Sequence, residues 1–213
     1  IREGKTKYSE NAGLLALRQA IARYLARTEG LSYDPASQIV VTPGAMGALF
    51  LALKVLLNPG DEVIVNEPCW TNYIQQIRMC GGVPVSVKTD AQRGFDLDVS
   101  AVAETITSKT KAIILNSPCN PTGAVASAET LSQLAKLAQE RDLVVLADEV
   151  YKHILFDGRT YTGFATLPGM KERTLVIDSL SKTYAMTGWR IGYAAGPEEL
   201  IRNMIKLQEN VSA

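Results

Sequence analysis

The chain has 213 residues, 46% of them hydrophobic, with 22 basic and 22 acidic side chains and no formal net charge. This composition suits one large domain with a substantial core, and the lack of a basic cluster argues against nucleic acid or an anionic membrane as a partner. No apolar run approaches the length of a membrane span. The three cysteines are widely spaced and form no C-x-x-C pair, which fits a reducing cytoplasm and predicts neither a metal site nor a disulfide framework.

Short β-rich runs alternate with segments of helical periodicity along the chain. In chain order we expect a helix at 13–30, a strand at 38–42, a helix at about 45–57, a strand at 61–67, a helix at 71–80, a strand at 83–88, a helix at 97–106, a strand at 111–117, a helix at 128–141, strands at 143–149, 174–181 and 190–196, and a helix from Pro197 onward. Several strands are continuously apolar, as strands covered on both faces are. The alternation predicts an α/β fold of three layers, with a mainly parallel seven-stranded sheet between helices.

Polar segments follow four of the predicted strands. They are TPGAMGA at 42–48, SPCNPTG at 117–123, DEVY at 148–151 and SLSK at 179–182. Ligands of such sheets bind at the carboxyl ends of the strands. We therefore expect these four segments to converge on one pocket.

The glycine turn at Gly44 is a candidate phosphate site. It opens a helix, so the backbone N–H groups of Ala45 and Met46, together with the helix dipole, can hold an anion. A tight turn without a ligand is the simpler alternative. Because the chain contains neither a P-loop nor a dinucleotide fingerprint, the phosphate would belong to another kind of ligand.

Single residues of the other segments each have an ordinary structural explanation. Asp148 follows a buried strand and needs a partner, which a solvated strand end or a helix N-cap also supplies. Asn120 suits a turn, Tyr151 suits a core, and the lone His153 is expected to be a surface or packing residue rather than a catalyst. Glu149 is expected to point away from Asp148, to the opposite face of the strand.

Lys182 lacks such an explanation, because it lies among hydroxyl residues in a segment that otherwise reads as packed. No other lysine is expected to be buried near a strand end. An amine there can react with a carbonyl, Asp148 can hold a ring nitrogen, and Asn120 and Tyr151 can donate to a ring oxygen. A lysine Schiff base and an acidic partner for the pyridine nitrogen are the hallmarks of sites for pyridoxal 5′-phosphate.

The phosphate of that cofactor accounts for the remaining polar residues. Ser179 and the Gly44 turn are expected to anchor it, with Arg190 as a fork-shaped donor. Ser181 is expected to assist. The sequence thus predicts one cofactor, pyridoxal 5′-phosphate, and no metal.

The stretch SLSKTYAMTGWRIGY at 179–193 resembles the lysine motif of class I aminotransferases, which are fold-type I pyridoxal-phosphate enzymes. NSPCNPTG, ADEVY and TPGAMGA follow the order of that family's motifs, and the resemblance covers essentially the whole chain. It implies that Trp70 in EPCW stacks on the cofactor ring. It also implies a homodimer, in which Tyr8 reaches the phosphate held by the partner subunit.

The resemblance further implies the reaction. Lys182 forms a Schiff base with the cofactor and then moves a proton, Asp148 keeps the pyridine nitrogen protonated, and Tyr151 assists. An amino group would pass between an L-amino acid and a 2-oxo acid. The neutral Met46, where some aspartate-preferring relatives have lysine, favours a neutral, aromatic or broad substrate.

The chain at 1–213 resembles only the large, cofactor-binding domain of this family. The N-terminal arm and the small C-terminal domain, which carries the arginine for the substrate carboxylate, are expected to lie outside it. We therefore expect that the chain alone does not transaminate. The resemblance also implies that the Glu67–Pro68 and Asn120–Pro121 peptide bonds are cis.

Three alternatives remain open at this point. A pyridoxal-phosphate lyase or synthase would keep every one of these motifs. An aminotransferase-like sensor domain of a transcription regulator would do so without being an enzyme. An unrelated doubly wound binding domain would have no use for Lys182.

Overall fold

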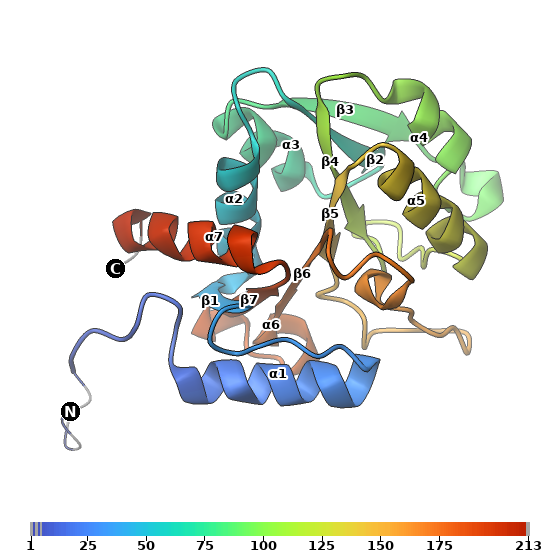
Figure 1. Cartoon of the computed structure of the whole chain (residues 1–213). Coiled ribbons are helices and arrows are strands. Elements are labelled where there is room, and N and C mark those ends of the chain that lie inside the picture. Colours follow the sequence, from blue (N-terminus) through green and yellow to red (C-terminus); the bar gives the residue numbers. More distant parts are fainter. Residues whose placement is uncertain (1, 3, 5, 212–213) are drawn as a thin grey trace.

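The computed structural model describes residues 2, 4 and 6–211, so both ends of the expected 1–213 domain lie outside the described residues. One seven-stranded sheet forms the middle layer (Figure 1). Its strands, in the order in which they lie side by side, are β1 (Ile39–Pro43), β7 (Ile191–Ala195), β6 (Thr174–Ser179), β5 (Val144–Asp148), β4 (Thr110–Asn116), β2 (Glu62–Glu67) and β3 (Val83–Lys88). The seven predicted strands are confirmed.

Helices cover both faces of the sheet, which confirms the three layers. Apolar side chains of α2 (Gly44–Leu56), α3 (Thr71–Met79) and α7 (Glu198–Val211) pack on one face. The opposite face packs on α1 (Leu15–Glu29), which covers β1, β7 and β6, and on α4 (Val99–Thr105) and α5 (Ala128–Glu140), which cover the other strands. Successive strand residues alternate between the two faces, as the pleat requires. No helix among the described residues is both long enough and apolar enough to cross a membrane.

The sheet is mainly parallel, as predicted, with one strand reversed. β7 runs antiparallel to both β1 and β6, whereas the other neighbouring pairs are parallel. Only a short connection separates β6 from β7, and a short connection favours an antiparallel neighbour because a parallel crossover needs a dozen or more residues.

The predicted strand at 174–181 is too long. β6 ends at Ser179, and the short helix α6 (Leu180–Thr183) begins there. The Ser179 side chain accepts a hydrogen bond from the backbone N–H of Ser181, 3.3 Å away, and so caps this helix. The polar side chains of SLSK thereby leave the ladder of the sheet and turn toward its carboxyl edge.

Candidate active site

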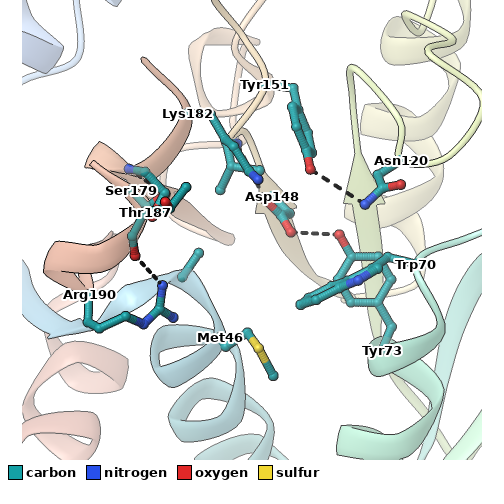
Figure 2. A pocket seen from close by; sticks show the side chains of 13 residues that line it. Met46, Trp70, Tyr73, Asn120, Asp148, Tyr151, Ser179, Lys182, Thr187 and Arg190 are labelled. Atoms are coloured by element: carbon teal, nitrogen blue, oxygen red, sulfur yellow. Dashed lines mark hydrogen bonds between the residues drawn. The ribbon is translucent and has the colours of Figure 1, made fainter. Parts of the chain in front are cut away.

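A cavity of about 320 Å³ lies where the carboxyl ends of β5 and β6 meet the first turn of α2 (Figure 2). Its walls come from all four polar segments. It is lined by Ala45, Met46, Trp70, Tyr73, Asn120, Asp148, Val150, Tyr151, Ser179, Ser181, Lys182, Thr187 and Arg190. The predicted convergence is therefore correct, and of the predicted site residues only Gly44 and Tyr8 are absent from the lining.

Figure 2 shows how the side chains divide around the cavity. On one side lie Arg190, Thr187 and Ser179; on the other lie Asn120, Trp70 and Tyr73; between them are Lys182 and Asp148. The side with Arg190 offers donors for an anion. The opposite side offers flat rings, with Trp70 and Tyr73 edge to face at 87° and 5.4 Å between centroids.

Asp148 is the buried acid of the cavity. Its carboxylate accepts a 2.6 Å hydrogen bond from the Tyr73 hydroxyl and a 3.3 Å bond from the backbone N–H of Val150. Burial raises the pKa of Asp148 to about 6, against the lowering effect of the Tyr73 bond. The carboxylate therefore has hydrogen-bond donors, but burial still destabilises its ionised form. A cation in the cavity would reduce this destabilisation.

Tyr73 was not predicted from the sequence. It is fully buried, and burial followed by the nearby Asp148 carboxylate raises its pKa well above the usual range, so it remains a donor. In the sequence it has the spacing of a core residue on an amphipathic helix, with Ile77 one turn later. That pattern carries no signal for a role in the cavity. Val150, just after β5, and Thr187, in the turn before β7, were also not predicted.

The anion side of the cavity is built from close backbone contacts. Gly44 has φ of +73°, and a Cβ on it would lie 2.7 Å from Nη2 of Arg190. A Cβ on Gly192 would lie 2.3 Å from the backbone carbon of Gly44. Gly44 thus supports the cavity without lining it, because its lack of a side chain allows the guanidinium to lie against the first turn of α2.

Arg190 and the first turn of α2 both direct donors at this side. Arg190 has a left-handed backbone and donates a 2.9 Å hydrogen bond from Nη1 to the carbonyl of Thr187. The first N–H groups of α2, at Ala45 and Met46, have no acceptor within the helix, as at any helix N-terminus. These donors, together with the hydroxyl of Ser179, fit a phosphate.

Lys182 lies on α6 with its Nζ 5.6 Å from the centroid of the Tyr151 ring. The expectation that its segment is packed is wrong for this chain, because Lys182 is exposed and Trp189 is 70% exposed. Residues 184–190 are all exposed or half-buried, so this stretch is not part of a core. The Lys182 amine is thus accessible from the cavity.

The expectation that no other lysine is buried near a strand end is also wrong. Lys152, four residues beyond β5, is 3% exposed. It faces the side of the sheet opposite the cavity, where it forms an ion pair with Glu149. Glu149 therefore points away from Asp148, as predicted. His153 is exposed, which agrees with the predicted surface or packing position.

The remaining predictions concern the ring side and the N-terminal segment. Nδ2 of Asn120 donates to the Tyr151 hydroxyl at 3.5 Å, so the two lie together. The Glu67–Pro68 and Asn120–Pro121 bonds are cis, as predicted, and Ser117–Pro118 is cis as well. Tyr8 is 93% exposed and lies outside the cavity of its own chain.

The comparisons with known proteins agree with this geometry. The family model "Aminotransferase class I and II" matches residues 2–213. The aspartate/prephenate aminotransferase of Thermus thermophilus is 45% identical over 204 residues, which cover 96% of this chain and 52% of that protein.

Solved structures agree as well. The aromatic aminotransferase of Pyrococcus horikoshii has a TM-score of 0.95 at 42% identity, over 98% of this chain and 56% of that one. The N-succinyldiaminopimelate aminotransferase of Mycobacterium tuberculosis has a TM-score of 0.96 at 41% identity, over 100% of this chain and 56% of that one. The chain spans about half the length of the relatives that it matches. With its fold and its cavity residues in this arrangement, the chain belongs to the class I and II aminotransferase family.

Proposed function

We propose that this chain is the large domain of a pyridoxal 5′-phosphate-dependent aminotransferase that moves an amino group between an L-amino acid and a 2-oxo acid. One observation carries the proposal. A lysine amine, a buried carboxylate and an anion cradle face one cavity of about 320 Å³. Family membership supports the reaction type, since the family generally depends on this cofactor.

The residues present fit the cofactor. Asp148 is a buried acid whose pKa, raised to about 6 by burial, returns toward its usual range when a cation is placed beside it. A protonated pyridine nitrogen is such a cation. The first turn of α2, which begins at Gly44, offers with Arg190 and Ser179 the donors that a phosphate requires.

Each residue then has a physical role. Arg190, Ser179 and the N–H groups of Ala45 and Met46 would hold the phosphate, with Ser181 beside them. Trp70 would lie against the ring, and the Asn120–Tyr151 pair would donate to the ring oxygen. When bound, the cofactor supplies an electron sink for the substrate α-carbon.

Lys182 and Asp148 would perform the steps that belong to the protein. Lys182 Nζ would attach to the cofactor aldehyde and, once released by a substrate amine, carry a proton to and from the α-carbon. Positioned proton transfer of this kind contributes about 10²–10⁴ in rate. Asp148 would hold the ring nitrogen in its protonated state, and the Tyr73 hydroxyl fixes the orientation of the Asp148 carboxylate.

The substrate is a further part of the proposal. Relatives are named for aspartate, prephenate and aromatic substrates, so the names span acidic and aromatic side chains. Met46 adds an uncharged thioether to the cavity wall. We propose a neutral, aromatic or broad amino donor, bound in a homodimeric cytoplasmic enzyme whose small domain supplies the arginine for the substrate carboxylate.

The test uses the full-length protein with pyridoxal phosphate. Amino donors are screened against 2-oxoglutarate and pyruvate, and the new amino acid is quantified. Stoichiometric formation of the amino acid from the added 2-oxo acid supports the proposal. Release of ammonia with pyruvate identifies a lyase, and cofactor binding without turnover favours a sensor domain.

A further inference from the structure

A buried cluster of charges lies behind the cavity, on the opposite face of the sheet. At its centre is Lys152, whose side chain is 2% exposed. Its Nζ lies 2.8 Å from Oε1 of Glu29, 2.9 Å from Oδ2 of Asp178 and 3.5 Å from Oε2 of Glu149. The ammonium also lies 5.2 Å from the centroid of the Tyr24 ring. Burying four charged groups is costly, so this cluster requires an explanation.

The carboxylates of the cluster are direct neighbours of cavity residues in the sequence. Glu149 follows Asp148 at the end of β5, and Asp178 precedes Ser179 at the end of β6. Because successive strand residues face opposite sides, Asp148 and Ser179 point into the cavity while Glu149 and Asp178 point behind it. Lys152 therefore binds both strands at the level of the two residues proposed to hold opposite ends of the cofactor.

Other contacts fix the cluster in place. The Tyr193 hydroxyl donates to Oδ2 of Asp178 at 2.9 Å, from the strand that pairs with β6. The backbone N–H of Glu149 donates to the carbonyl of Ile177 at 2.9 Å. Glu29 is the last residue of α1, so Lys152 also ties that helix to the two strand ends.

We propose that Lys152 is a positioning residue of the cofactor site, which holds Asp148 and Ser179 in register by binding the carboxylates beside them from the other face of the sheet. This inference rests on the proposed function, because pyridoxal phosphate is the ligand that bridges the two residues. Its ring would need Asp148 and its phosphate would need Ser179 at a fixed separation. If Asp148 and Ser179 shift relative to each other, binding of the whole cofactor is weakened more than binding of an isolated phosphate.

The test variant removes the ion pair between Lys152 and Asp178 and keeps the net charge of the protein unchanged. The double variant Lys152→Met with Asp178→Asn removes one positive and one negative charge, so the net charge of the cluster is unchanged. It leaves Asp148 and Ser179 themselves unchanged.

The chain offers a matched control at the other end of the same strands. Nη1 of Arg173, just before β6, lies 3.1 Å from Oδ1 of Asp142, just before β5. The double variant Arg173→Met with Asp142→Asn also removes one charge of each sign. It cuts a link between the amino ends of β5 and β6, away from the cavity.

Both double variants of the full-length protein are compared with wild type by titrating the cofactor-free form with pyridoxal phosphate and, separately, with inorganic phosphate. We expect the Lys152–Asp178 variant to bind pyridoxal phosphate at least about tenfold more weakly, the usual effect of removing a group that orients a binding residue. Its affinity for inorganic phosphate is expected to stay within about twofold of wild type. Inorganic phosphate would occupy only the Ser179 side of the cavity, so its binding does not depend on the separation of Ser179 and Asp148. The control is expected to match wild type for both ligands.

The outcomes separate this inference from the proposed function. If wild type itself does not bind pyridoxal phosphate, the proposed function is wrong. If wild type binds it and the Lys152–Asp178 variant binds it equally well, or if both double variants lose affinity alike, Lys152 does not position the site. Should the double variant not fold, Asp178→Asn alone gives a second test, because it removes the anion that lies 2.9 Å from Nζ of Lys152 and keeps the cation. Unchanged pyridoxal phosphate affinity in Asp178→Asn also overturns the inference.

Discussion

At the scale of one residue, the buried carboxylate of Asp148 lowers the stability of the cofactor-free fold. In the cofactor-free chain, burial raises its pKa from 3.8 to about 6. Between these values the folded chain keeps a proton that the unfolded chain has lost, so the stability of the fold decreases as pH rises through this window. The gap corresponds to about 3 kcal/mol once both states are ionised.

We therefore expect Asp148→Asn to stabilise the cofactor-free protein at pH 7.5 by up to about 3 kcal/mol, and to leave its stability near that of wild type at pH 4. The same change weakens cofactor binding, because it removes the anion that faces the ring nitrogen. Denaturant unfolding at both pH values measures the first effect. If the variant and wild type differ in stability by the same amount at the two pH values, the ionised Asp148 carboxylate does not destabilise the fold as proposed.

At the scale of elements, the contact between β7 and α2 decides whether the anion cradle forms. A Cβ at Gly192 would lie 2.3 Å from the Gly44 backbone carbon and 2.4 Å from the Ala45 nitrogen. We expect Gly192→Ala to separate the two elements, to cost about 1–3 kcal/mol of stability, as overpacking does, and to weaken phosphate binding. Urea unfolding and phosphate titration measure these effects.

Gly188→Ala is the matched control for that substitution. Gly188 lies four residues earlier, just before β7, and an added Cβ there meets nothing within 4 Å. Its stability and phosphate affinity are expected to match wild type. If both alanine variants behave alike, close packing at Gly192 is not what shapes the cradle.

The same scale shows what the sequence could predict. Periodicity located every strand and the longer helices, and the motifs after the strands identified most of the cavity lining, because both signals are local. The direction of β7 depends on pairing between distant segments, and α6 depends on a cap formed at the end of β6. Tyr73 contacts Asp148, 75 positions away, and Lys152 contacts Asp178, 26 positions away, so local patterns do not reveal either residue.

For the whole molecule, the proposed homodimer places Tyr8 at the partner's phosphate. Tyr8 is 93% exposed in its own chain, so its hydroxyl is free to reach a neighbour without disturbing the core. We expect Tyr8→Phe in the full-length protein to weaken pyridoxal phosphate binding about tenfold or more, the size of one hydrogen bond to a charged group. The unfolding midpoint of the cofactor-free protein is expected to stay unchanged.

Dilution gives an independent check of the shared site. If the partner supplies a phosphate donor, cofactor affinity falls as the dimer dissociates. Equilibrium dialysis across the dissociation range, with mass measured by light scattering, follows both quantities. A monomer that binds the cofactor as tightly as the dimer contradicts the shared site.

The central claim is that Lys182 is the amine that binds the cofactor. The most direct measurement is borohydride reduction of the full-length protein with pyridoxal phosphate, followed by tryptic digestion and mass spectrometry. Trypsin does not cleave after a modified lysine, so the claim predicts one labelled peptide spanning 174–190 with the added mass on Lys182, and no label in Lys182→Ala. Label on another lysine, Lys152 included, or a labelled Lys182→Ala protein, would contradict the account.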